Sequence, residues 1–218
     1  DWPAVAGDLD RLGGKELYEQ VMSVRPFDHI FKREYLVDEE YADNVNPLPF
    51  AFNFDRRPKL PDELKYDVAF WAVESDPIRT AALDLIQNEF DCAENGSIKN
   101  QEMKKYKRKG DFYLQELSRC KISLNFRGAG WDTLRYWEVP SLAGFMISQK
   151  PGIVIENNFE HEKEIVYCKD DLTDLIELCQ YYLKHDEQRR EIGRNALNKV
   201  KAFHMDVHRA QKILEVSA

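Results

Sequence analysis

The residues whose types and spacing are best suited to chemistry lie between Lys121 and Ser148. A glycine turn, Gly128 to Gly130, follows a short apolar run and is followed by Asp132 and Thr133, which are N-cap and first-turn residue types. Glycines let the backbone approach a ligand closely, and the unpaired N–H groups at the start of a helix attract phosphate. This stretch therefore predicts a site for an anionic ligand.

Three charged side chains flank this turn. Arg127 precedes it, and Arg135 and Glu138 follow it. The guanidinium groups of Arg127 and Arg135 could neutralise phosphate groups. With a phosphate near Gly130, the carboxylate of Glu138 could accept hydrogen bonds from a ribose diol. The residue types together predict binding of a nucleotide.

A strand, a helix and a second strand must position these residues. Apolar side chains alternate over residues 122–126, which predicts a buried strand, and residues 134–142 carry helix-spaced apolar residues. Residues 145–147 begin the next apolar run, which completes a βαβ unit. The third glycine of the dinucleotide fingerprint is absent because position 133 is Thr, so plain scaffold is the alternative interpretation.

A second strand-to-helix junction is predicted near residue 75. The apolar run from Tyr66 to Val73 is typical of a central parallel strand, and Ser75, Asp76 and Pro77 start a helix. The carboxyl ends of parallel strands share one edge of a sheet, so Arg79 could reach the same phosphate. A surface arginine is the alternative interpretation.

Residues 121–144 resemble the donor-binding segment of GT-B glycosyltransferases, most closely the spore-maturation-protein-like family, with a fainter similarity to exostosin-type enzymes. The resemblance implies that Arg135 and Glu138 form the family's Arg-x-x-Glu pair and that Glu138 holds the nucleotide ribose. The first acidic residue of the retaining Glu-x7-Glu motif falls on Gly130. A carboxylate expected near the donor sugar is therefore missing, and retention or inversion stays open.

The implied fold is α/β, a doubly wound parallel sheet of about five or six strands with a helical C-terminus. This is the Rossmann-like C-terminal half of a GT-B fold. The prolines Pro47 and Pro49 favour an extended linker. Residues 1–45 are expected to be the tail of an N-terminal acceptor domain with its linker, and residues 46–218 the C-terminal nucleotide-sugar-binding domain. A self-contained domain with an irregular N-terminal arm is the alternative.

The charge and the composition of the chain argue against several classes of binding partner and site. The formal charge of -8 over 218 residues argues against a general nucleic-acid surface. No apolar stretch approaches the roughly 20 residues of a membrane span, and no signal pattern begins the sequence, so a cytoplasmic location is expected. The four cysteines lack metal-binding spacing and are expected to be reduced structural thiols. His204 and His208 share a helix face without a third ligand nearby, so no metal site is predicted.

The leading hypothesis is a glycosyltransferase that moves a sugar from a nucleotide-diphosphate-sugar donor to a glycan or other acceptor. Arg79, Arg127, Arg135 and helix N–H groups would stabilise the leaving diphosphate, so no metal and no cofactor besides the donor substrate is expected. The catalytic residues stay unassigned, and the general base of an inverting reaction would come from the missing N-terminal domain of the same protein. A non-catalytic nucleotide-sugar-fold interaction module and a sugar-nucleotide epimerase are the alternatives.

Overall fold

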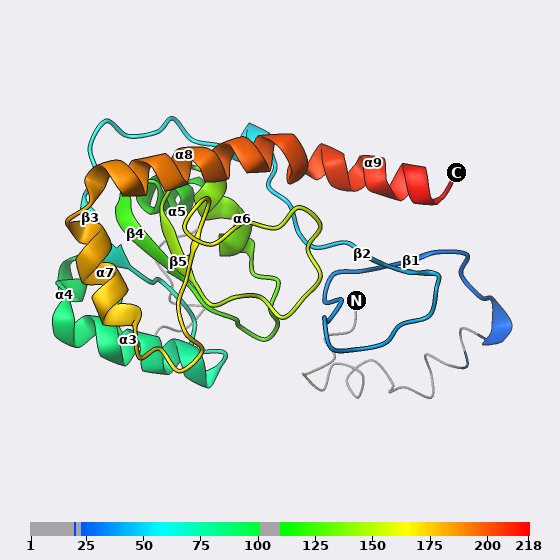
Figure 1. Cartoon of the computed structure of the whole chain (residues 1–218), viewed down its shortest axis with the longest axis horizontal. Coiled ribbons are helices and arrows are strands. Elements are labelled where there is room, and N and C mark those ends of the chain that lie inside the picture. Colours follow the sequence, from blue (N-terminus) through cyan, green and yellow to red (C-terminus); the bar gives the residue numbers. More distant parts are fainter. Residues whose placement is uncertain (1–19, 21–22, 101–109) are drawn as a thin grey trace.

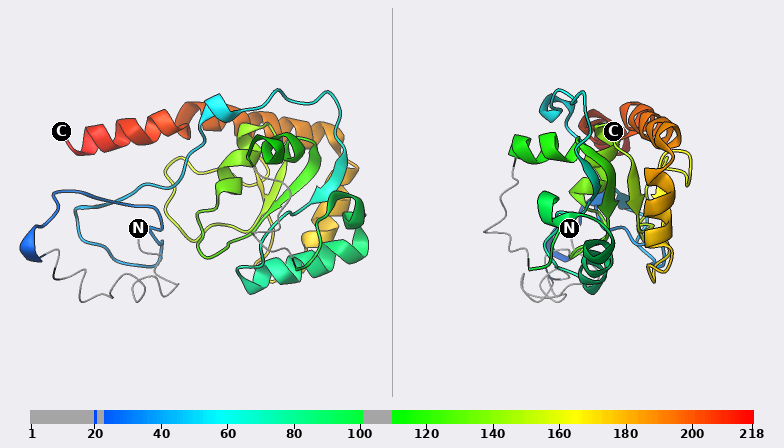
Figure 2. Two further views of the ribbon diagram at one scale, coloured as in Figure 1. Left: turned by 180° about the vertical axis from the view of Figure 1, so that it is seen from behind. Right: turned by 90° about the vertical axis from the view of Figure 1, so that its left-hand side faces the viewer.

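The structure is a computed structural model that describes residue 20, residues 23–100 and residues 110–218. Within these residues, one parallel sheet contains four strands in sequential order, β3 (Tyr66–Ala69), β4 (Cys120–Asn125), β5 (Met146–Ser148) and β6 (Val166–Tyr167). Helices cover the sheet on both faces (Figures 1 and 2). The predicted α/β class is confirmed, although the described sheet has fewer strands than the five or six expected.

The helices accompany and follow these strands. They are α3 (Pro77–Glu89), α4 (Cys92–Asn95), α5 (Gly110–Leu117), α6 (Leu134–Ser141), α7 (Leu175–Leu183), α8 (Asp186–Phe203) and α9 (Asp206–Val216). The 3-10 helix η1 (Phe54–Arg56) precedes β3. The predicted helical C-terminus is confirmed by α7, α8 and α9, and α9 projects past the end of the sheet (Figure 1).

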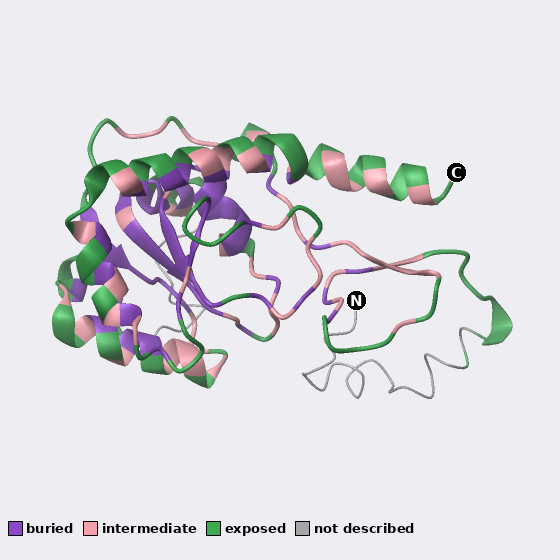
Figure 3. Ribbon diagram, in the orientation of Figure 1, coloured by how far each residue is buried: buried purple, intermediate pink, exposed green. Residues whose placement is uncertain are grey.

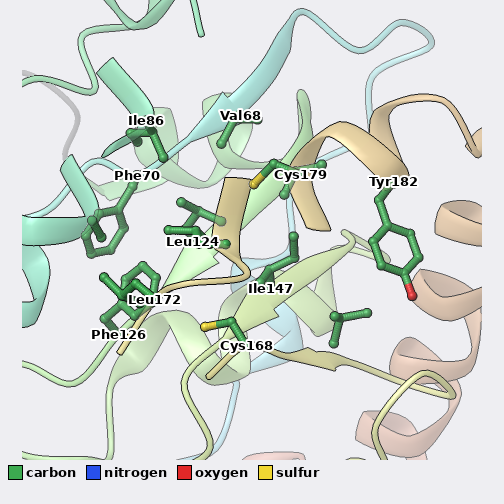
Figure 4. Close-up of a cluster of buried hydrophobic side chains, with 14 of the residues drawn as sticks. Val68, Phe70, Ile86, Leu124, Phe126, Ile147, Cys168, Leu172, Cys179 and Tyr182 are labelled. Carbon is green, nitrogen blue, oxygen red and sulfur yellow. The ribbon is translucent and has the colours of Figure 1, made fainter. Parts of the chain in front are cut away.

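Two buried clusters fill the space between the sheet and its helices (Figure 3). Successive residues of a strand point to opposite faces, so Val68 and Phe70 enter one cluster while Ala69 and Trp71 enter the other. The first cluster packs α3 and α7 on the sheet (Figure 4), and the second packs α5, α6 and α8. Each fully buried large apolar side chain contributes roughly 1.5 to 3 kcal/mol to folding.

The N-terminal segment forms its own parallel pair, β1 (Ile30–Lys32) with β2 (Val45–Pro47). We call residues 32–37, which begin with the last residue of β1, the strap. Residues 35–37 of the strap lie against the loop after β5. Leu36 forms an antiparallel bridge with Ile153. The predicted domain boundary between residues 45 and 46 falls inside β2, and the division into two domains remains a prediction.

Within the described residues, no helix combines the length and the apolar character needed to cross a bilayer. All four cysteines are buried thiols rather than disulfides, as predicted. The sequence from Lys15 to Val24 predicts an amphipathic helix, but this segment falls mostly outside the described residues. The lysine-rich run from Lys104 to Lys109, which is typical of a solvated helix face or loop, lies wholly outside them.

Helix α6 ends close to α8. Ala143 adopts a left-handed conformation with φ of 57°, and its carbonyl oxygen faces Gly193 of α8. A Cβ built on Gly193 would lie well under 3.0 Å from that backbone oxygen, a distance that real Cβ atoms do not show. The glycine therefore sets how closely α8 approaches the end of α6.

We expect Gly193→Ala to lower the free energy of unfolding by about 1 to 3 kcal/mol, because the added methyl group overpacks this contact. Helix propensity alone would give the opposite sign, since Ala favours helix over Gly by about 1 kcal/mol. Asn198→Ala, on the exposed face of the same helix, is the matched control and should not destabilise. Urea unfolding of the three proteins measures this, and a stabilised Gly193→Ala variant would contradict it.

Candidate functional site

The predicted βαβ unit is present, and its turn lies at the carboxyl end of β4. The strand ends at Asn125, and the turn closes through a hydrogen bond of 2.9 Å from the N–H of Gly128 to the carbonyl of Gly130. Thr133 then occupies the N-cap position of α6. The loop after β3 reaches the same edge, as the sequence predicts for parallel strands.

Arg79 ties the two strand-end loops together. Its Nε donates to the carbonyl of Arg127 (2.8 Å), Nη1 to Val73 (3.0 Å) and Nη2 to Phe126 (3.1 Å). A Cβ on Gly128 would lie 2.8 Å from this guanidinium, so the glycine is needed for the close approach. Arg79 therefore holds backbone carbonyls of the turn, whereas the sequence suggested a direct contact with phosphate.

Arg127 lies on the outer side of the turn. Its guanidinium stacks on the ring of Trp131 at 4.5 Å, and its Nε lies 3.1 Å from Oδ2 of Asp76 in the second loop. The side chain keeps 21% of its surface exposed. Among the predicted arginines, this one combines a place at the turn with access to solvent.

The N–H groups that follow the glycines already hold a carboxylate. Glu34 of the strap accepts hydrogen bonds from the N–H of Trp131 at Oε2 and of Asp132 at Oε1, each 2.9 Å long. Its residue is 2% exposed, and a Cβ on Gly130 would collide with it. Sequence reasoning did not identify Glu34, because it lies nearly a hundred positions from the turn and no local pattern marks it.

Asp132 is buried beneath this contact. Its carboxylate accepts hydrogen bonds from the N–H of Phe50 (2.7 Å) and from Nε1 of Trp137 (2.8 Å). Burial raises the pKa of Asp132 to about 6, against these two hydrogen bonds, which lower it. Thr133, predicted to act with Asp132 as a cap, directs its hydroxyl to Asn125 (2.7 Å) and makes no side-chain cap.

The Arg-x-x-Glu pair meets Tyr113 of α5. Nε of Arg135 donates to the Tyr113 hydroxyl (3.2 Å), and another guanidinium nitrogen donates to the carbonyl of Trp71. The Tyr113 hydroxyl in turn hydrogen-bonds to Glu138, which is 7% exposed. Burial raises the pKa of Glu138, while the charges of Arg135 and Arg56 lower it. Tyr113 was not identified from the sequence.

The predicted site residues thus fall into two neighbouring groups. Arg79, Arg127 and the glycines form the turn group, and Arg135 and Glu138 form the α6 group. Arg79 binds the carbonyl of Val73 and Arg135 binds that of Trp71, so both groups contact the same short segment after β3. Cavities of about 190 and 690 Å³ lie at the opposite, amino-terminal edge of the sheet, near Cys120 and Lys65 respectively. Ligands of such sheets bind at the carboxyl edge, so we place the candidate site there.

The two histidines that share a helix face in the sequence are engaged separately. His204 is buried, and its Nε2 lies 3.0 Å from the carbonyl of Asn157. Burial lowers the pKa of His204 to about 4. His208 accepts a hydrogen bond from the N–H of Met205 through Nδ1 (3.0 Å). Among the described residues, no group of three or more His, Cys, Asp or Glu side chains could hold a metal ion.

The raised pKa of Asp132 predicts a pH-dependent contribution to stability. The folded state binds this proton more tightly than the unfolded chain, so lowering the pH from 7 to about 4.5 favours folding through Asp132, by roughly 2 kcal/mol. The lowered pKa of His204 acts in the opposite direction over the same range. The pH dependence of the whole protein is therefore a poor measure of either group.

We expect the unfolding free energy of the unmodified protein, minus that of Asp132→Asn, to increase as the pH falls from 7 to 4.5. The subtraction removes the contribution of His204, because both proteins contain this residue. The side chain of Asn can still accept one of the two hydrogen bonds. Urea unfolding at several pH values measures the difference, with the exposed Asp62→Asn as control. A difference that is flat with pH, or that decreases, would contradict the assignment.

Comparison with known proteins identifies the family. The family profile described as glycosyl transferase-like matches residues 80–215, more than half of the chain. No curated protein matches the sequence significantly. Sucrose-phosphate synthase from Thermosynechococcus elongatus has a similar structure, with a TM-score of 0.57 and 13% identity over 81% of this chain and 52% of that one. The chain therefore spans about half the length of that protein, and their likeness confirms the predicted GT-B type of fold. From the profile match over residues 80–215, the chain belongs to the glycosyl transferase-like family.

Proposed function

We propose that this chain binds a nucleotide-diphosphate-sugar and takes part in transferring its sugar to a glycan or other acceptor. Membership of the glycosyl transferase-like family supports glycosyl transfer in general. The observation that carries the nucleotide assignment is the Arg135–Tyr113–Glu138 cluster at the carboxyl edge, beside the glycine turn. It joins a carboxylate suited to a ribose with a turn suited to phosphate.

Glu138 can serve as the ribose ligand while it remains bonded to Tyr113. A carboxylate has two oxygens with about four lone-pair sites, and the Tyr113 hydroxyl uses one of them. Burial raises the pKa of Glu138, and the positive charges of Arg135 and Arg56 oppose this shift. The ionised form is the one that accepts hydrogen bonds most strongly. We infer that the ribose hydroxyls donate to the remaining lone pairs.

The diphosphate is proposed to bind at the glycine turn. The N–H groups of Trp131 and Asp132 are aimed at a carboxylate, which supports the turn as a place for an anion. Arg127, at the same turn and partly exposed, supplies positive charge. Arg79 acts indirectly, because it binds the carbonyls of Phe126 and Arg127 that would otherwise repel phosphate.

The four buried thiols also support a proposed cytoplasmic location. Disulfides form and persist in oxidising compartments and are rare in the cytosol. All four cysteines of this chain are in the reduced form within apolar surroundings.

We expect Glu138→Gln to weaken binding of a nucleoside diphosphate at least tenfold, or about 1.4 kcal/mol. The same substitution should change the affinity for the corresponding 2′-deoxynucleoside diphosphate less than threefold, because the contact that is lost is with the ribose diol. Calorimetric titration of uridine, guanosine and adenosine diphosphates measures both, with the exposed Glu89→Gln as control. Equal affinities of Glu138→Gln and the unmodified chain for every nucleotide that binds would contradict the proposed function.

Neutralisation of the diphosphate by Arg127 and backbone N–H groups leads to a second expectation. The affinity of the preferred nucleoside diphosphate should change less than twofold when EDTA replaces added magnesium. Arg127→Gln should weaken that affinity at least tenfold, whereas Arg190→Gln, exposed on α8, should not change it. Loss of binding in EDTA that magnesium restores would show that a metal ion carries part of this charge.

A further inference from the structure

The strap delivers a negative charge to the turn proposed for the diphosphate. Glu34 accepts from two consecutive backbone N–H groups, those of Trp131 and Asp132, at 2.9 Å each. The carboxylate also fills the space beside Gly130, where a Cβ atom would lie 2.5 Å from its Oε1. A phosphate oxygen and this carboxylate cannot accept the same two hydrogen bonds at once.

Burying a second carboxylate here has an electrostatic cost. Glu34 raises the pKa of the neighbouring Asp132, although burial is the main cause of that shift. Nε of Arg33 lies 3.9 Å from Oε1 of Glu34 and 4.0 Å from Oδ2 of Asp132. One guanidinium group is therefore shared between two carboxylates. The pair of N–H groups therefore holds an anion against the repulsion of an adjacent carboxylate.

The strap has other attachments besides Glu34. The N–H of Val154 donates to the carbonyl of Tyr35 (2.8 Å), and the N–H of Val37 donates to that of Gly152 (3.1 Å). Leu36 is 7% exposed against this loop. These contacts cover the loop after β5 at the same edge of the sheet, so the strap lies across the region where the donor is proposed to bind.

We propose that the strap is an internal inhibitor in which Glu34 occupies the N–H groups that the donor diphosphate requires. This inference rests on the proposed function. Donor binding then requires the strap to leave the turn, and the apparent affinity is reduced by the fraction of molecules in which it is bound. Any partner or ligand that holds the strap away from the turn raises the affinity for the donor.

Inorganic diphosphate tests this competition directly, because it has no ribose and does not depend on Glu138. Glu34→Gln keeps the shape of the side chain but removes its charge and one of its two acceptors. We expect this variant to bind inorganic diphosphate at least tenfold more tightly than the unmodified chain. Glu39→Gln, an exposed residue soon after the strap, should remain within twofold. Equal affinity of Glu34→Gln and the unmodified chain would overturn the proposal.

A reversible crosslink gives the opposite test and does not alter Glu34. Leu36 and Ile153 form a non-hydrogen-bonded antiparallel pair, the type whose side chains lie closest together. In the double variant Leu36→Cys and Ile153→Cys, the disulfide should lower diphosphate affinity at least tenfold, and reduction should restore it. Unchanged affinity in the oxidised form would overturn the proposal.

These measurements separate the two proposals. If Glu34→Gln gains affinity for inorganic diphosphate but no nucleotide discriminates ribose from deoxyribose through Glu138, the inhibitory strap stands and the nucleotide assignment fails. If nucleotides bind through Glu138 and neither the Glu34 variant nor the crosslink alters diphosphate affinity, the function stands and the strap is only structural. Thermal unfolding of each variant confirms that it is folded before titration.

Discussion

The turn between β4 and α6 depends on how its buried backbone groups find hydrogen-bond partners. Arg79 binds the carbonyls of Phe126 and Arg127, and Glu34 binds the N–H groups of Trp131 and Asp132. A buried donor or acceptor without a partner costs about 1 to 3 kcal/mol. Both side chains come from other parts of the sequence, so the conformation of the turn is set by long-range contacts.

The same turn is joined to residues 49–50 and to the C-terminal helix α9. Asp132 accepts from the N–H of Phe50, and Arg209 of α9 donates to the carbonyls of Phe50 (3.1 Å) and Pro49 (3.0 Å). The Arg209 guanidinium lies over the ring of Trp137 at 5.2 Å, and Trp137 donates to Asp132. These hydrogen bonds connect residues 49–50 with the start of α6 and with α9.

The two parts of the proposed site differ in what their binding groups contact within the chain. Glu138 and Arg135 lie on α6, which packs against the sheet, and the Tyr113 hydroxyl contacts both side chains. The N–H groups of the turn are equally well positioned but hold an internal carboxylate. Under the proposed function, only the diphosphate would compete with a part of the chain itself, so binding of the nucleoside and binding of the diphosphate would be controlled separately.

The sequence by itself determined the elements that carry the site. Alternating apolar residues over 122–126 and the glycines at 128 and 130 predicted β4 and its turn, and helix-spaced apolar residues over 134–142 predicted α6. The parallel α/β class follows from that order of elements, and the GT-B type of fold is what the resemblance over residues 121–144 implies. These features are local, because backbone periodicity is written in neighbouring residues.

The tertiary structure decided which side chains meet at the turn. Sequence placed Arg79 near phosphate because it opens a helix, but three backbone carbonyls take its guanidinium. Glu34 and Tyr113 carry no local signal, since their roles depend on contacts with Trp131, Asp132, Arg135 and Glu138, which are far away in the chain. Hydrogen bonds between distant segments form only when the core brings those segments together, and no spacing of residues encodes them.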